Sequence, residues 1–276
     1  MIRRPPRSTQ SRSSAASDVY KRQALVCGSS DGIGKAIAVE FAKSGANVIL
    51  LARTENKLKS VLQSLEKKEQ QNHYFVPVDM NDIDYMIKQV EKLIQKIGHI
   101  DILVNNSGGP NPGPIHQATL EELEIAFNQH IKSAHALTQL LIKDMISQKF
   151  GRIINIISIG LKEPIQNLGI SNTIRGAMGS WAKTLSKELA PYGITVNNIL
   201  PGYTATQRLM DLFHNNANKL GISYEDYSKS VLEKIPTGRF AKPEEIAYLA
   251  TFLASKYSSY INGASIPIDG AFLSSI

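Results

Sequence analysis

The chain of 276 residues contains a single cysteine and a single tryptophan, and it lacks any apolar run of the ~18 residues that a membrane span needs. One cysteine, Cys27, excludes an internal disulfide framework and suits a reducing compartment, so we expect a cytoplasmic protein without a membrane partner. We interpret Cys27 as a small core residue. The six histidines show no metal-ligand spacing, which predicts no metal site.

The net charge of +7 is unevenly distributed along the chain. Residues 1–23 hold six basic side chains and one acid, so the rest of the sequence has the charge balance of an ordinary globular surface. A protein that binds nucleic acid through a basic face needs those charges clustered on its folded part. The sequence therefore predicts no nucleic-acid partner.

Residues 1–23 are rich in arginine and serine and lack the apolar segment of a secretory signal. We favour an origin in translated sequencing-adapter text that was joined to the gene when short reads were assembled. An organellar transit peptide and a native disordered arm are the alternatives. Under each of the three we expect this leader to lie outside a single domain formed by residues 24–276.

From residue 24 onward, short apolar runs alternate with segments of helical spacing. Near-continuous runs of β-branched residues are typical of strands buried on both faces, as in a parallel sheet. Strands that alternate with helices form right-handed βαβ units, so the pattern predicts a doubly wound α/β fold. The expected strands are 24–28, 47–52, 73–79, 101–106, 152–158, 195–200 and 265–269, and the expected helices are 33–44, 54–70, 82–98, 119–148, 172–191 and 243–255.

One segment does not follow this compact pattern. Residues 203–241, here called the lid segment, are long and polar and connect the sixth strand to the last helix. Connections of that length are usually functional, so we expect the segment to cover a binding site.

The first strand leads into a helix through three glycines. Residues 24–34 read ALVCGSSDGIG, with Gly28, Gly32 and Gly34 in the spacing G-x-x-x-G-x-G. Glycine permits positive φ and lets the backbone approach a ligand closely. The N–H groups and the dipole at a helix N-terminus attract anions, so the motif predicts a pyrophosphate site.

Further motifs follow in order along the chain. They are LVNNSG (103–108), RIINIIS (152–158), LSKELAPYGITVNNILPG (185–202), GRFAKPEEIAYLATFLAS (238–255) and YINGASIPIDG (260–270). Together with the glycine motif they resemble the short-chain dehydrogenase/reductase family, especially its branch similar to 3-oxoacyl-acyl-carrier-protein reductases. The resemblance covers roughly residues 24–272.

That resemblance implies a seven-stranded, Rossmann-type parallel sheet with a nicotinamide dinucleotide across its carboxyl edge. It also implies a homotetramer that transfers a hydride between this cofactor and a small carbonyl or secondary alcohol substrate. The cofactor-binding residues that it implies are Gly28, Ser29, Ser30, Gly32, Ile33, Gly34, Asp79, Asn105, Gly108, Arg175, Pro201, Gly202 and Thr206.

The end of the second strand bears on the choice of cofactor. Members of the family that prefer NAD place an acid there, whereas this chain has Ala52 followed by Arg53. A carboxylate repels a 2′-phosphate, and a guanidinium can bind one with two hydrogen bonds. We therefore expect NADP(H) in preference to NAD(H), unless Arg53 is only a solvated strand end.

The catalytic positions depart from the family pattern of Asn, Ser, Tyr and Lys. The serine is present as Ser158, but the tyrosine position is Ser171, the lysine position is Arg175 and the asparagine position is His130. An aliphatic hydroxyl is a far poorer proton donor than a phenol, and an arginine keeps its proton. Histidine titrates near neutral pH, so His130 is a candidate acid–base group, unless it is a satisfied helix histidine.

Two hypotheses follow from this altered set. The first is an NADP(H)-dependent oxidoreductase in which His130, Ser171 or an ordered water delivers the proton, with Tyr203 as a further candidate. The alternative is a nucleotide-binding protein of the same fold without redox turnover, because a fold does not guarantee its usual chemistry.

Overall fold

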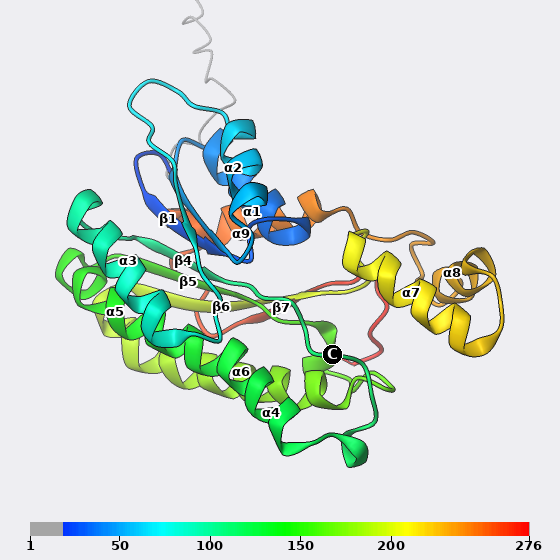
Figure 1. Ribbon diagram of the computed structural model, residues 1–276. Helices are drawn as coiled ribbons and strands as arrows, with labels where there is room; N and C mark the ends of the chain where they lie inside the picture. The colour runs from blue at the N-terminus through cyan, green and yellow to red at the C-terminus, as the bar shows by residue number, and fades with distance from the viewer. Residues whose placement is uncertain (1–18, 276) are drawn as a thin grey trace, which may run out of the picture.

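The computed structural model describes residues 19–275, and the origins considered for residues 1–18 lie outside the described residues. Seven parallel strands form one sheet in the order β3-β2-β1-β4-β5-β6-β7, which confirms the predicted doubly wound α/β fold (Figure 1). The strands are β1 Gln23–Cys27, β2 Asn47–Ala52, β3 Tyr74–Pro77, β4 Ile102–Asn105, β5 Gly151–Ile156, β6 Ile194–Pro201 and β7 Ser265–Ile268.

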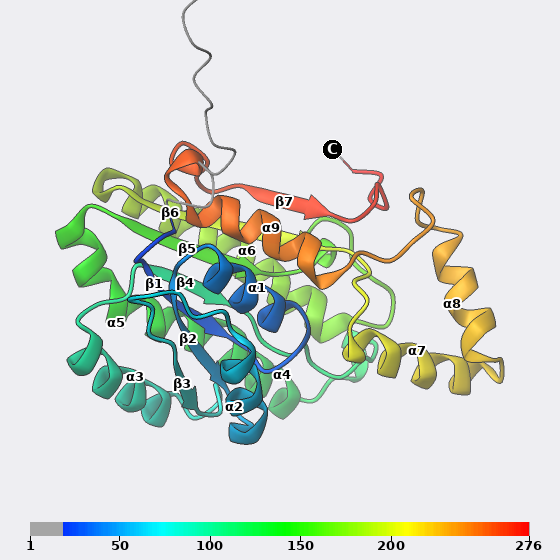
Figure 2. The same cartoon turned by 90° about the horizontal axis from the view of Figure 1, so that it is seen from above.

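Helices cover both faces of the sheet, as Figures 1 and 2 show. Alternate residues of β1 point to opposite faces, so that Val26 packs with one cluster and Leu25 with the other. The first cluster involves α1, α2 and α9, and the second involves α3, α5 and α6. The α-helices are α1 Gly32–Lys43, α2 Glu55–Ser64, α3 Ile83–Ile97, α4 Leu120–Phe127, α5 Ser133–Gln148, α6 Gly169–Leu189, α7 Gln207–Leu220, α8 Tyr224–Leu232 and α9 Pro243–Ala254.

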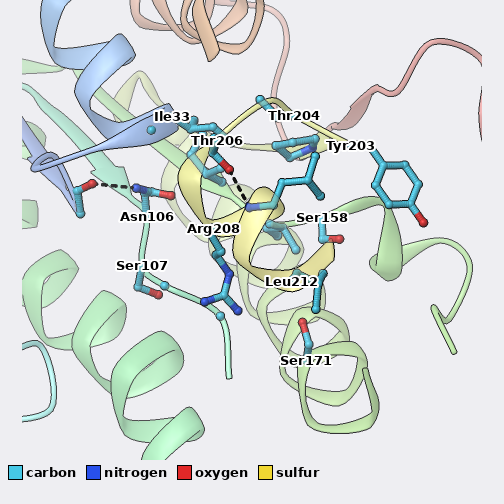
Figure 3. A pocket seen from close by; sticks show the side chains of 18 of the residues that line it. Ile33, Asn106, Ser107, Ser158, Ser171, Tyr203, Thr204, Thr206, Arg208 and Leu212 are labelled. Atoms are coloured by element: carbon cyan, nitrogen blue, oxygen red, sulfur yellow. Dashed lines mark hydrogen bonds between the residues drawn. The ribbon is translucent and has the colours of Figure 1, made fainter. Parts of the chain in front are cut away.

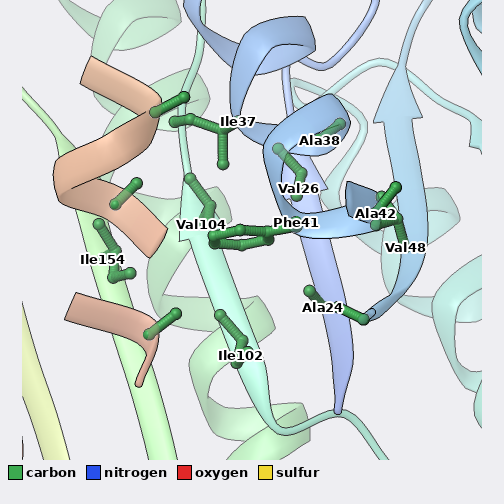
Figure 4. Close-up of a cluster of buried hydrophobic side chains, with 14 of the residues drawn as sticks. Ala24, Val26, Ile37, Ala38, Phe41, Ala42, Val48, Ile102, Val104 and Ile154 are labelled. Atoms are coloured by element: carbon green, nitrogen blue, oxygen red, sulfur yellow. The ribbon is translucent and has the colours of Figure 1, made fainter. Parts of the chain in front are cut away.

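Phe41 of α1 is the largest fully buried side chain of the first cluster. Figure 4 shows its ring beside Val104 of β4, between the helix and the sheet. Burial of a side chain of this size contributes roughly 1.5–3 kcal/mol to the free energy of unfolding. This packing fixes α1, and with it the loop that precedes α1, against the centre of the sheet.

The strand order places a crevice beside that loop. After β1 the chain forms β2 and β3 on one side of β1 in the sheet. It then returns and forms β4 on the other side of β1. The connections that follow β1 and β4 therefore lead to helices on opposite faces of the sheet, and ligands of doubly wound folds bind at this point of the carboxyl edge.

The packed domain begins before the expected boundary at residue 24. Val19 is fully buried in the first cluster, and Gln23 pairs with Asn47 as the first residue of β1. Arg22 Nη1 donates a hydrogen bond to Asp101 Oδ1 at 2.9 Å. A buried valine and a charge-assisted hydrogen bond both tie this segment to the sheet, so residues 19–23 lie within the domain.

Other differences concern helix boundaries. The helix expected at 119–148 is divided into α4 and α5 by a π-helical segment, Asn128–Lys132. The lid segment contains α7 and α8, which project beyond one edge of the sheet (Figure 2). Short 3₁₀ turns lie at Ile115–Gln117, Ile159–Leu161, Ala190–Tyr192 and Lys256–Ser258.

Candidate active site

The glycine loop is held in place by both conformation and close packing. Gly28 and Gly32 have φ of +58° and +52°, values that glycine adopts readily. Gly34 lies within α1, and a Cβ there would overlap the carbonyl oxygen of Gly28. A Cβ on Gly28 would lie 2.7 Å from the carbonyl oxygen of Asn106, so the loops after β1 and β4 touch.

A cavity of about 380 Å³ opens at the carboxyl edge of the sheet, within the size range of small-molecule sites (Figure 3). It joins the glycine loop to the ends of β5 and β6, to α6 and to the start of α7. The predicted site residues that line it are Gly28, Gly32, Ile33, Gly108, Ser158, Ser171, Arg175, Pro201, Gly202 and Thr206. Sequence reasoning thus identified much of the wall of this cavity.

The start of α7 closes the cavity above the glycine loop. Thr206 caps this helix, and its Oγ1 accepts a hydrogen bond from Leu209 N at 3.3 Å. A Cβ on Gly32 would lie 3.2 Å from Thr206 Cγ2, so the lid segment touches the loop directly. That residues 203–241 cover a binding site stays a prediction.

Several predicted cofactor residues lie apart from the cavity wall. Ser29 is fully buried, and its Oγ accepts a hydrogen bond from Leu51 N at 2.9 Å. Asn105 is also buried, and its Nδ2 donates to Asn155 Oδ1 at 2.8 Å. The residues in this group are Ser29, Ser30, Gly34, Arg53, Asp79 and Asn105, and their roles toward a cofactor stay predictions.

Arg53 and Asp79 lie together at the ends of β2 and β3. Arg53 Nη1 is 3.9 Å from Asp79 Oδ2, and the Arg53 side chain is 74 % exposed. A pair this exposed contributes little to stability. The guanidinium is therefore accessible to an anion from solution.

Ser158, just after β5, and Ser171, on α6, face the cavity (Figure 3). Ser158 Oγ accepts a hydrogen bond from Gly160 N at 3.0 Å, which leaves its own proton available to a ligand. Ser171 lies in the first turn of α6, where its short side chain lines the cavity wall. Both hydroxyls are polar groups that can donate a hydrogen bond to a carbonyl oxygen in the cavity.

Arg175 lies one turn further along α6 and is 8 % exposed. Its Nη1 donates to the carbonyl oxygen of Ile156 at 3.3 Å, and its Nε has no partner among the described residues. Burial and the charge of Arg208 lower the pKa of Arg175 to about 10. The side chain therefore stays charged at neutral pH and supplies positive potential to the cavity.

His130 lies in the π-helical segment, behind the main cavity. Its Nδ1 is 2.7 Å from Ser107 Oγ and 3.5 Å from Arg175 Nη1. Burial, together with the positive charge of Arg175, lowers the pKa of His130 to about 3. The ring is neutral near pH 7, so these surroundings favour the interpretation of His130 as a satisfied helix histidine over a proton donor.

Replacement of His130 by asparagine should make stability less sensitive to acid. The unfolded histidine takes up a proton below pH 6.5, whereas the folded one does so only near pH 3. The contribution of neutral His130 to the free energy of unfolding is therefore fully present above pH 6.5. As the pH falls below 6.5, this contribution decreases by up to about 1.4 kcal/mol per pH unit. The His130→Asn variant should lose stability less steeply as the pH falls below 6.5, as measured by urea unfolding.

The exposed His116 provides the control for this measurement. A His116→Asn variant changes the same residue type without removing a buried neutral ring. Its slope against pH should match that of the parent protein. Equal slopes in the parent protein and the His130→Asn variant would contradict a buried neutral His130.

Sequence reasoning missed other residues of the cavity wall. Asn106, rather than Asn105, lines the cavity, and its Nδ2 donates to the carbonyl oxygens of Cys27 and Gly28 at 3.2 and 3.3 Å (Figure 3). Asp31 caps α1 by accepting from Gly32 N at 2.7 Å. Arg208 reaches the wall from α7, and no motif in the lid segment marks it.

The other sequence predictions concern metals, thiols and membranes. Within residues 19–275, no group of histidine, cysteine and carboxylate side chains could hold a metal ion. Cys27 is fully buried, and burial raises the pKa of its thiol to about 12, which confirms its interpretation as a core residue. None of the helices in the described part of the chain is both long and apolar enough to span a bilayer.

The strand order, the crevice and the glycine loop together define a Rossmann-type dinucleotide-binding fold. A family model described as enoyl-(acyl carrier protein) reductase matches residues 28–272. The chain belongs to the short-chain dehydrogenase/reductase family. This confirms the resemblance found in the sequence.

Relatives match over nearly the whole chain. The NADPH-dependent reductase BacG of Bacillus subtilis is 34 % identical, covering 93 % of this chain and 99 % of its own. The 3-oxoacyl-[acyl-carrier-protein] reductase FabG of Thermotoga maritima is also 34 % identical, covering 90 % and 96 %. L-sorbose reductase from Gluconobacter frateurii, solved with NADPH and L-sorbose, is 32 % identical with a TM-score of 0.88, covering 94 % of this chain and 99 % of its own.

Proposed function

We propose that this protein is an NADPH-dependent reductase that converts a carbonyl group of a small molecule to a secondary alcohol. The observation that carries the proposal is one cavity that contains the glycine loop, the Ser158 hydroxyl and the Arg175 guanidinium. Relatives with the same fold are named NADPH-dependent reductases, and one was solved with NADPH and a sugar. Both lines support a hydride transfer inside this cavity.

The residues present fit a nicotinamide dinucleotide. Gly28 and Gly32 present backbone without a Cβ beside the N-terminus of α1, and nothing lies within 4 Å of a Cβ built on Gly108. These residues, with Ile33 and Thr206, would hold the diphosphate and riboses. When bound, the reduced cofactor supplies the hydride.

The exposed Arg53 supports a preference for the phosphorylated cofactor. It lies at the end of β2, where a guanidinium can bind a 2′-phosphate and where family members that prefer NAD carry an acid. Comparison of the two reduced dinucleotides in binding experiments tests this preference. Equal affinities would contradict it.

In the proposed mechanism Ser158 donates its hydrogen bond to the carbonyl oxygen. The charge of Arg175 stabilises the negative charge that develops on this oxygen as the carbonyl carbon accepts the hydride. The oxygen then takes a proton from a water in the cavity, because Ser171 is too weak an acid to replace a phenol, and the hydroxide that remains takes up a proton from the solvent. Loss of a positioned general acid costs about 10² to 10⁴ in rate, so slow turnover is expected.

One observation favours a second candidate, a nucleotide-binding protein without redox turnover. The tyrosine and lysine positions hold Ser171 and Arg175, and the nearby His130 has a pKa of about 3. Burial raises the pKa of Tyr203, a phenol that also lines the cavity. A cavity with so few groups that exchange protons near pH 7 is suited to binding as well as to slow chemistry.

An assay of NADPH oxidation separates the two candidates. Binding of NADPH and NADH is measured first by titration calorimetry. Absorbance loss is then followed with a panel of ketones that includes 3-oxoacyl thioesters. Turnover with any class of ketone supports the reductase, whereas tight NADPH binding without turnover across the panel supports the second candidate. Absence of dinucleotide binding would overturn both.

We also propose that the protein is a cytoplasmic homotetramer, as the family resemblance implies. Large apolar side chains of α4 are exposed, with Leu120 at 79 %, and Ile125 and Phe127 also project into solvent. An interface through α4, α5 and α6 would cover them. Sedimentation analysis of the purified protein tests the assembly.

A further inference from the structure

The cavity contains a second arginine, which faces Arg175. Arg208 extends from α7 toward the loop after β4, as Figure 3 shows, and its Nη2 donates to the carbonyl oxygen of Pro110 at 3.2 Å. A Cβ built on Gly109 would lie 2.8 Å from Arg208 Nη2 and 3.7 Å from Arg175 Nη2. Both guanidinium groups therefore approach one point beside Gly109.

Neither guanidinium has a carboxylate partner within 4.0 Å among the described residues. The negative charge of Asp211, on the same helix, favours the charged form of Arg208. The Asp211 carboxylate already accepts a hydrogen bond from Gln207 Nε2 at 2.9 Å. Arg175 Nε is buried and has no hydrogen-bond partner within residues 19–275. Arg175 is buried, whereas Arg208 is exposed to solvent. A buried cation beside a second cation is costly, and an anion bound between the two would offset that cost.

The two arginines lie at the end of the cavity that contains Ser171, where the carbonyl group of the substrate is proposed to bind. Arg175 is one turn after Ser171 on α6, and the loop that Arg208 contacts follows Ser107 and Gly108. The acid that lines the same cavity, Asp31, caps α1 at the glycine loop instead. Apolar side chains of Ile165, Leu168 and Leu212 line the wall with the arginines, which suits a short carbon skeleton.

We propose that Arg175 and Arg208 bind a carboxylate of the substrate, so that the natural substrate is a small oxo acid. Arginine suits this role because its planar fork matches a carboxylate with two parallel hydrogen bonds. The inference rests on the proposed reductase function for the reaction, but the anion site itself is independent of turnover.

The test compares oxo acids with their neutral amides. The pairs are 2-oxopentanoate with 2-oxopentanamide and 4-oxopentanoate with 4-oxopentanamide, each assayed with NADPH. At least one acid should exceed its amide by about tenfold or more in kcat/KM, as expected for a charge-assisted pair. Arg208→Gln should bring that ratio close to one, and Lys219→Gln, an exposed change at the far end of α7, should leave it intact.

Calorimetry supplies a readout without turnover. The same acids and amides are titrated into the protein alone and into protein saturated with NADP⁺. Acid binding that Arg208→Gln abolishes supports the site, even if no ketone is reduced and the reductase proposal fails. Equal affinity and equal kcat/KM for acids and amides overturn the inference and leave the reductase standing. A loss of NADPH affinity in Arg208→Gln with an unchanged acid-to-amide ratio also overturns it, because Arg208 then binds the cofactor's phosphates.

Discussion

The double variant Ser171→Tyr with Arg175→Lys is expected to reduce ketones about 10²-fold faster than the parent protein, measured as kcat under saturating NADPH. The change restores a phenol at the first turn of α6 and a cation one turn later. A phenol has a pKa near 10, and a neighbouring cation lowers it further, so it donates a proton far more readily than serine. Ser171 lines the open cavity, which gives the larger ring space.

The matched control is Ser171→Phe with Arg175→Lys, which adds the ring without the hydroxyl. It should gain nothing, because only the phenol supplies a proton. The tyrosine variant should also acquire an alkaline limb in its profile of kcat against pH as the phenol ionises. A gain that the phenylalanine variant shares would show that ring packing is responsible, and no gain in either would show that proton delivery is not the slow step.

The sheet could be predicted because its signal is local. The apolar runs that form β1, β2 and β5 are buried on both faces, and each ends within one or two residues of the predicted position. The glycine loop could be predicted equally well, because the positive φ found at Gly28 and Gly32 strongly favours glycine over other residue types. The family resemblance singled out Ser158, Ser171 and Arg175, and all three line one cavity.

The remaining features depend on contacts between distant parts of the chain. Val19 packs in the cluster that contains α1, and Arg22 forms a hydrogen bond with Asp101. The composition of the leader gives no sign of either contact. The low pKa of His130 arises from burial in a π-helical segment beside Arg175, so its neutral state cannot be inferred from residue type. Arg208 was missed because only the folded helix α7 carries it across to the loop after β4.

Replacement of Ser158 by alanine should lower kcat for ketone reduction by about 10² to 10³ while the affinity for NADPH stays within about twofold. The hydroxyl is the donor that the cavity wall offers at the end of β5, and its benefit grows as charge develops on the substrate oxygen. The loss should therefore appear in kcat more than in KM.

Ser158 also accepts a hydrogen bond from Gly160 N, so the variant could shift the 3₁₀ turn at Ile159–Leu161. Ser158→Thr keeps the hydroxyl and should retain most of the activity, which separates the chemical role from the structural one. Ser180→Ala, an exposed change on α6, should match the parent protein. Equal kcat in Ser158→Ala and the parent would mean that the Ser158 hydroxyl does not stabilise the developing charge, a role that the positive charge of Arg175 would then fill.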